Sequence, residues 1–187
     1  MKNIVIFASG SGTNAENIIK YFEQTVSASV TTVLSNKRDA KVLDRANTHN
    51  KSAFYFNKTA FFNGQVLQLL DALKPDLIVL AGFLWKVPSA IINSFPDKII
   101  NIHPALLPKY GGKGMYGMRI HEAVVNNKET ESGITIHYVN EQYDEGNIIF
   151  QEKIAVTPSD TPEDIAAKIH ELEYTHFPKV IEKLLHD

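Results

Sequence analysis

A run of apolar residues gives way to polar chemistry in the stretch Lys98-Ile-Ile-Asn-Ile-His-Pro-Ala-Leu-Leu-Pro-Lys109. The isoleucines indicate a strand, and alternate side chains of a strand share a face, so Asn101 and His103 point the same way. Pro104 and Pro108 prevent the strand from continuing, which holds this amide and imidazole at its carboxyl end. Open α/β sheets bind ligands at that end of their strands. The pair is therefore either part of a ligand site or simply two satisfied polar groups at a strand end.

Strands and helices alternate on the N-terminal side of this stretch, and the apolar runs there are typical of strands buried on both faces. After it, a helix precedes two strands that we expect to be antiparallel. The fold class expected is α/β, Rossmann-like, with a mostly parallel mixed sheet, helices on both faces and an antiparallel edge. The predicted strands are residues 3–8, 30–34, 53–56, 76–82, 99–102, 134–139 and 148–156, and helices are predicted after residue 14, at 41–47, 61–73 and 120–126, and from residue 161.

Length and composition narrow the class of protein. With 187 residues the chain is long enough for one domain with its own core, and we expect a single domain over 1–187. Its 19 basic and 21 acidic residues give a net charge of −2, which argues against the broad cationic surface of nucleic-acid-binding proteins. The absence of cysteine excludes disulfides and thiolate chemistry. The first apolar run is too short for a signal peptide or a membrane span, so we expect a cytoplasmic protein that does not contact membranes.

A glycine-rich turn, Gly10-Ser-Gly-Thr-Asn14, follows the first predicted strand and opens the first helix. Backbone N–H groups at such a helix start can hold an anionic oxygen, so the turn is a candidate phosphate site. Gly10, Gly12 and Ala15 also loosely fit the dinucleotide-binding pattern. That pattern needs a carboxylate at the end of the second strand, where the sequence reads Leu34-Ser-Asn-Lys37. A tight turn with no ligand is the remaining alternative.

A late turn, Tyr143-Asp-Glu-Gly146, carries the carboxylate that we expect to meet the central histidine. By composition alone, an exposed turn aspartate is the simpler reading of Asp144. Beside His103, however, it would raise the pKa of the imidazole and have its own lowered. With the Asn101 amide, the set would suit acyl transfer to an amine, in which an oxyanion forms while protons leave nitrogen.

Two further places in the chain are candidates for ligand contact. Residues 80–87 are an apolar run that is either plain core or one wall of a flat pocket at a second strand end. Glu173 lies beside the apolar stripe of the last helix, where a carboxylate is either at the solvent border or bonded to a ligand. The histidines at 49, 121, 137, 170, 176 and 186 show no metal-ligand spacing.

Taken together, these motifs resemble one enzyme family along the whole chain, the folate-dependent phosphoribosylglycinamide formyltransferases. The resemblance implies a formyltransferase fold in which residues 1–100 form a phosphate-binding half and residues 101–187 a catalytic and folate-binding half. The segments that carry it are Ala8-Ser-Gly-Ser-Gly-Thr-Asn14, Leu34-Ser-Asn-Lys37, Val79-Leu-Ala-Gly-Phe83, Asn101-Ile-His-Pro-Ala-Leu-Leu-Pro-Lys-Tyr110, Gly133-Ile-Thr-Ile-His137 and Tyr143-Asp-Glu-Gly146.

The resemblance also implies residue roles and a reaction. Asn101, His103 and Asp144 would be catalytic, and the formyl group of 10-formyltetrahydrofolate would pass to the amine of phosphoribosylglycinamide in purine (IMP) synthesis. Asn101 and protonated His103 would stabilise the oxyanion, while Asp144 keeps His103 charged. The ribotide would contact Gly12, Thr13 and Asn14 through its phosphate and Glu173 through its ribose. The folate would contact Leu84, Trp85, Lys86, Val87, Asn101, Asn140, Glu141 and Asp144.

The same resemblance implies small-molecule partners, no metal, and a monomer or homodimer. Related enzymes formylate other amines, so a nucleotide-linked amino sugar is an alternative substrate. A tRNA substrate would need a basic appended domain, which we do not expect here. A nucleotide-binding module without catalysis is the alternative outside enzymes, and it predicts that His103 can be replaced without consequence.

Overall fold

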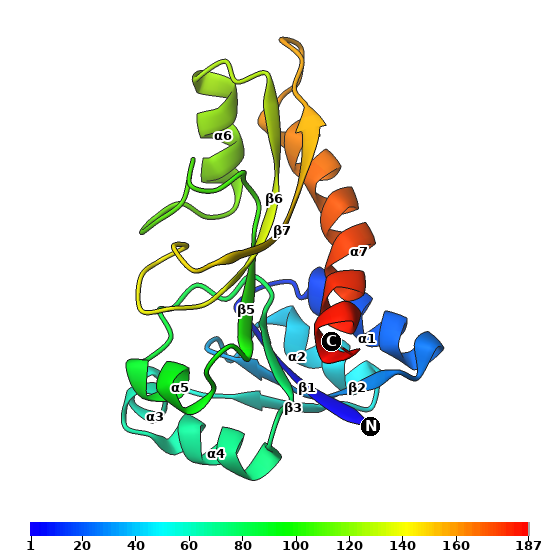
Figure 1. Cartoon of the computed structure of the whole chain (residues 1–187), viewed down its shortest axis with the longest axis vertical. Coiled ribbons are helices and arrows are strands. Elements are labelled where there is room, and N and C mark those ends of the chain that lie inside the picture. The colour runs from blue at the N-terminus through cyan, green and yellow to red at the C-terminus, as the bar shows by residue number, and fades with distance from the viewer. Residues whose placement is uncertain (187) are drawn as a thin grey trace.

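The computed structural model describes residues 1–186, and within them one mixed sheet of seven strands forms the centre of the molecule (Figure 1). The strand order is β3-β2-β1-β4-β5-β6-β7. The first five pair in parallel, whereas β6 runs antiparallel to β5 and β7 antiparallel to β6. The strands are β1 (Lys2–Ala8), β2 (Ala28–Ser35), β3 (Ser52–Tyr55), β4 (Leu77–Leu80), β5 (Ile99–His103), β6 (Glu131–Tyr138) and β7 (Ile148–Ala155).

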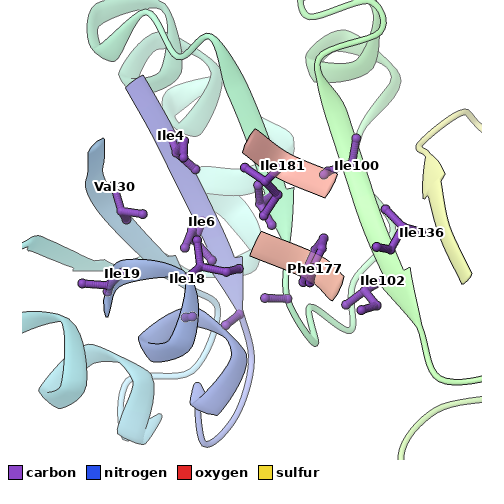
Figure 2. Packing of buried hydrophobic residues seen from close by; sticks show 14 of the residues in the cluster. Ile4, Ile6, Ile18, Ile19, Val30, Ile100, Ile102, Ile136, Phe177 and Ile181 are labelled. Carbon is purple, nitrogen blue, oxygen red and sulfur yellow. The ribbon is translucent and has the colours of Figure 1, made fainter. Parts of the chain in front are cut away.

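Helices cover both faces of this sheet, as the sequence predicts. On one face α1 and α7 pack against the isoleucines of β1 and β5, and Figure 2 shows Phe177 and Ile181 of α7 between these strands. The other face is covered by α3, α4 and α5, with Phe61 and Leu70 in the second core cluster. The helices are α1 (Thr13–Thr25), α2 (Lys41–Thr48), α3 (Lys58–Phe62), α4 (Gln65–Leu73), α5 (Ser89–Ser94), α6 (Met118–Asn126) and α7 (Pro162–His186).

The predicted elements are confirmed with one exception in the middle of the chain. The helix expected over residues 61–73 is two helices, α3 and α4, which meet at Gly64. Gly64 has a φ of +93°, a left-handed conformation that a continuous right-handed helix cannot contain. The apolar pattern runs through this break because both helices bury side chains against the same face of the sheet.

Two points of the fold matter for the site. The central strands β1, β4 and β5 bring their carboxyl ends to one edge of the sheet, and β5 ends there at His103. The antiparallel pairing of β5 with β6 sets Asn101 opposite His137, and His103 opposite Thr135. No helix within residues 1–186 is both long and apolar enough to cross a membrane.

Candidate active site

The central histidine and the late-turn aspartate lie together at the end of β5. His103 Nδ1 is 3.6 Å from Asp144 Oδ2, across the 41 positions that separate them in the chain. Asp144 sits in the connection between β6 and β7 with a φ of +56°, and the backbone N–H of Gly112 donates to its Oδ2 at 2.9 Å. The structure therefore brings Asp144 to His103 by folding two loops, 104–117 and 139–147, over the end of the sheet.

His103 is held through its other nitrogen. Nε2 lies 2.8 Å from the carbonyl oxygen of Tyr110, and because a carbonyl only accepts, Nε2 carries the hydrogen. Nδ1 is therefore the nitrogen that is free to gain or lose a proton, and it faces both the cavity and Asp144. The imidazole is 4% exposed, so its ring position is set by packing as well as by this hydrogen bond.

The effect of Asp144 on the pKa of His103 has the predicted direction, but the net shift of this pKa is downward, so the expectation of a resident imidazolium is wrong. Burial lowers the pKa of His103 below its ordinary value and is the largest effect, while the charge of Asp144 and the Tyr110 carbonyl act in the opposite direction. Desolvation disfavours the charged imidazolium more than one carboxylate at 3.6 Å favours it. At neutral pH, His103 is accordingly poised as a neutral base rather than as an imidazolium.

The carboxylate shows the shift that the sequence predicts. Burial pushes the pKa of Asp144 upward, but the imidazoles of His137 and His103 and the N–H of Gly112 together hold this pKa below its usual value. Hydrogen bonds and positive charge favour the ionised form of a carboxyl group. Asp144 therefore stays a carboxylate beside His103 and can stabilise a proton that the imidazole picks up.

His137 of β6 is a site residue to which the sequence assigned no role. Its Nδ1 lies 2.9 Å from the carbonyl oxygen of Tyr138, so the lone pair of Nε2 is free to accept from Asn101 Nδ2 at 3.1 Å. The same Nε2 is 3.7 Å from Asp144 Oδ1. The signal that points to it is the pairing of two strands, each with polar residues at alternate positions, Asn101-x-His103 and Thr135-x-His137.

The Asn101 amide is thereby oriented by a neighbour rather than left to rotate. One N–H of Nδ2 is engaged by His137, and the second remains available to the cavity that Asn101 lines. An amide fixed in this way is a preorganised donor for an oxygen on which negative charge develops.

A cavity of about 630 Å³ connects these groups with the glycine-rich turn. Its wall includes all four predicted ribotide contacts, Gly12, Thr13, Asn14 and Glu173, together with the three predicted catalytic residues. Residues 81–84 after β4, residues 112–117 of the glycine-rich loop, helix α6 and helix α7 supply further walls. Residues from six separate parts of the chain therefore face one space large enough for small-molecule substrates.

The glycine-rich turn has the geometry of an anion site. Gly12 precedes α1 with a φ of +75°, and no side chain caps the free N–H groups of the first helical turn. A Cβ at Gly12 would lie 2.3 Å from Val42 Cγ2 and 2.7 Å from the Val42 Cα, so only glycine allows this close approach. Arg45 of α2 braces the same turn by donating from Nε to the carbonyl oxygen of Ser11 at 2.9 Å.

Glu173 is buried at the far side of this turn, where it joins α1 to α7. Its Oε2 accepts from Asn14 Nδ2 and lies near His170 Nδ1, each at 2.8 Å. The hydrogen bond to Glu173 raises the pKa of His170 against the opposing effect of burial. The second oxygen, Oε1, makes no hydrogen bond to any residue in 1–186, so it is free for a ligand in the cavity.

The predicted folate contacts divide between two spaces. Leu84 lines the large cavity, while Trp85, Lys86, Val87 and Asn140 line a smaller one of about 60 Å³. Asn101 and Asp144 border both, so the two spaces meet at the reacting groups. Glu141 is exposed and lines neither cavity. Within residues 1–186, no three histidine or acidic side chains are grouped as a metal site would require.

Comparison with known proteins assigns the chain to a family. The family model described as formyl transferase matches residues 2–181. This chain belongs to the formyl transferase family. The phosphoribosylglycinamide formyltransferase of Bacillus subtilis (strain 168) is 36% identical to it over 192 residues, covering 99% of this chain and 95% of the relative. The chloroplastic phosphoribosylglycinamide formyltransferase of Arabidopsis thaliana is 35% identical over 187 residues, covering 96% of this chain and 64% of the relative.

Solved structures agree with this formyl transferase in fold. Glycinamide ribonucleotide transformylase 1 from Symbiobacterium toebii superimposes with a TM-score of 0.91 at 30% identity, covering 100% of this chain and 88% of that one. The phosphoribosylglycinamide formyltransferase from Bacillus Halodurans superimposes with a TM-score of 0.89 at 33% identity, covering 98% of this chain and 95% of that one. The expected fold class is therefore confirmed. The chain covers 64% of the length of the Arabidopsis thaliana relative, which is less than two thirds.

Proposed function

We propose that this formyl transferase moves the formyl group of 10-formyltetrahydrofolate to the amine of 5′-phosphoribosylglycinamide. The products would be formylglycinamide ribotide and tetrahydrofolate, a step of de novo purine (IMP) synthesis. One observation carries the proposal, namely that the His103–Asp144 pair, with a 3.6 Å separation, shares a cavity with an uncapped, glycine-rich helix start. The names of the relatives support the same reaction.

The ribotide would bind with its phosphate at the glycine-rich turn. The free N–H groups at the start of α1, from Gly12, Thr13 and Asn14, provide donors and the positive end of the helix dipole. Glu173 would accept from the ribose through its free Oε1. This orientation would extend the glycinamide amine along the cavity toward His103 and Asn101, which line the same space.

In the proposed reaction, neutral His103 accepts the proton that the amine loses, and ionised Asp144 stabilises the charge that results. The amine nitrogen attacks the formyl carbon, a C–N bond forms, and the carbonyl electron pair moves to oxygen, which accepts the free N–H of Asn101. The nitrogen then loses a proton to Nδ1 of neutral His103, directly or through a water molecule. Asp144 stabilises the resulting imidazolium at 3.6 Å. When the intermediate collapses, the bond to N10 of the folate breaks and N10 takes this proton.

The folate would approach from the smaller cavity. Leu84, Trp85, Lys86 and Val87 lie in the connection between β4 and α5 and offer apolar surface together with backbone groups for a pterin ring. The connection after β6 would form the opposite side through Asn140, and Glu141, which lines neither cavity, would contact a part of the folate that extends outside them. Asn101 and Asp144 border this space, which would place the formyl group between the two substrates.

The two alternative functions each require only a part of this site. A nucleotide-linked amino sugar would use the same acyl-transfer groups but would not require the phosphate site at Gly12 to Asn14. A nucleotide-binding module would require that site but not a base paired with a carboxylate. The co-occurrence of both in one cavity favours the ribotide. We further expect a cytoplasmic enzyme, monomeric or homodimeric, that needs no metal.

The decisive experiment is a spectroscopic assay of the purified protein with phosphoribosylglycinamide and 10-formyltetrahydrofolate. We expect turnover in the native chain and a loss of about two to four orders of magnitude in kcat for His103→Ala and Asp144→Asn, with small changes in ribotide KM. Asp39→Asn and His186→Ala alter exposed residues of the same types and serve as controls. Turnover close to native in both site variants would refute the proposed mechanism.

A further inference from the structure

The tautomer of His103 depends on the position of the Tyr110 carbonyl oxygen. A neutral imidazole has one hydrogen, and two acceptors compete for it here. The Tyr110 oxygen lies 2.8 Å from Nε2, within hydrogen-bond distance, whereas Asp144 Oδ2 lies 3.6 Å from Nδ1, beyond it. If the Tyr110 carbonyl moved away, the carboxylate would draw the hydrogen to Nδ1. The imidazole would then lose the lone pair that serves as the base in the cavity.

The backbone of Tyr110 has a conformation that other contacts must hold. Its φ of +57° lies in the left-handed region, which is unfavourable for a residue with a side chain. Gly111 and Gly112 follow it, and neither has a side chain that could fix the peptide by packing. The contacts that hold the Tyr110 carbonyl in place are therefore expected to come from the tyrosine side chain.

The hydroxyl group of Tyr110 is bonded on the far side of the loop from His103. It donates to Glu129 Oε1 and accepts from Asn127 Nδ2, each at 2.9 Å. Glu129 lies between α6 and β6, and Lys109 and the Tyr110 hydroxyl hold its pKa below the usual value, so the bond to its carboxylate is charge-assisted. Lys109 Nζ lies 3.0 Å from Glu129 Oε2, but the lysine side chain is 67% exposed, and such ion pairs contribute little.

We propose that Glu129 is a positioning residue for His103, because its bond to the Tyr110 hydroxyl holds the Tyr110 carbonyl on Nε2 and thereby keeps Nδ1 free as the base. Glu129 lines neither cavity, so it would act through Tyr110 rather than by touching a substrate. The inference rests on the proposed function only for what this tautomer does in the reaction.

The first test measures the tautomer of His103 by nitrogen NMR of protein with isotopically labelled histidine, at a pH above the pKa of His103. His103→Gln assigns the two signals. In the native protein we expect the hydrogen on Nε2. In Tyr110→Phe, which keeps the ring and removes the hydroxyl, and in Glu129→Ala, part of the population should carry it on Nδ1. Lys109→Ala removes the ion pair but not the tyrosine bond, so this control should keep the native tautomer.

The second test measures steady-state kinetics with both substrates. We expect Tyr110→Phe and Glu129→Ala each to lower kcat about tenfold with both KM values little changed, because a charge-assisted hydrogen bond shifts an equilibrium by about that factor. The double variant should lose no more than Tyr110→Phe alone, since both changes remove the same bond. Glu129→Gln, whose amide oxygen can still accept from the hydroxyl, should recover part of the loss.

These measurements can overturn the inference in three ways. The native protein could carry the hydrogen on Nδ1, both single variants could keep the native tautomer or the native kcat, or the two single losses could multiply in the double variant, which would show that the residues act independently. If the native protein does not formylate the ribotide, the proposed function fails, but the tautomer still decides the role of Glu129. Thermal melting confirms that each variant compared is folded.

Discussion

The glycine at the start of α1 offers a direct test of the geometry that holds the phosphate turn. Gly12 has a φ of +75°, and a methyl group there would lie 2.3 Å from Val42 Cγ2, 2.4 Å from Val42 Cβ and 2.7 Å from Val42 Cα. Real Cβ atoms do not approach other atoms so closely, and the backbone of α2 cannot move as a flexible side chain would. Gly12→Ala must therefore displace the turn from α2.

The expected cost has two parts. A left-handed backbone disfavours any side chain by about 1–2 kcal/mol. Overpacking a fixed neighbour adds about 1–3 kcal/mol. For a chain of this length each kcal/mol lowers the melting temperature by about 2–4 °C, so Gly12→Ala, at about 3 kcal/mol, should melt about 6–12 °C below the native protein.

Two other glycines separate these contributions in urea unfolding and thermal melting. Gly10 belongs to the same turn, lacks a positive φ and has nothing within 4 Å of its Cβ position, so Gly10→Ala should change stability little. Gly64 has a φ of +93° with nothing within 4 Å, so Gly64→Ala should show the backbone cost alone. If Gly12→Ala were no less stable than Gly64→Ala, the close contact with Val42 would be refuted. The ribotide KM of Gly12→Ala should rise as well.

Three further predictions concern catalysis, binding and the core. Since burial holds the pKa of His103 below 6.5, kcat/KM of the native protein should fall only below that pH. In Asp144→Asn the acid limb of the residual activity should move to a still lower pH, because the carboxylate that raises this pKa is gone. An acid limb that moved upward in a pH–rate profile would contradict this. Asn14→Ala, which removes the 2.8 Å bond to Glu173, should raise the ribotide KM about tenfold at unchanged kcat, as steady-state kinetics would show. Phe177→Ala, fully buried, should cost about 3–5 kcal/mol in urea unfolding, whereas Phe62→Ala, at a residue 54% exposed, should cost far less.

Much of the architecture could be predicted from local pattern. The continuous apolar runs of β1 and β4 identify strands buried on both faces, and their alternation with helices predicts a parallel sheet. The break of the predicted 61–73 helix at Gly64 could not be predicted in the same way. An apolar stripe looks alike in one helix and in two when both pack on the same face, and only the backbone conformation of Gly64 distinguishes them.

Some site residues could likewise be predicted from local pattern, whereas others depend on tertiary contacts. Alternation within one strand predicts that Asn101 and His103 share a face, and this information lies within three consecutive residues. The contacts of His137 depend on pairing between strands, so they leave no local signature. His137 can be predicted as a site residue only once β5 and β6 are paired in register, because this pairing sets it opposite Asn101.

By itself, the sequence determined the strand that ends at His103, the glycine turn that precedes α1 and the kind of chemistry that their side chains allow. The tertiary structure alone decided the direction in which the pKa of His103 shifts. Burial of the imidazole outweighs the carboxylate of Asp144, although both groups were correctly expected to meet. Proximity of two residues can be inferred from motifs, but the free energy of removing a charge from water depends on everything packed around it, which no short stretch of sequence contains.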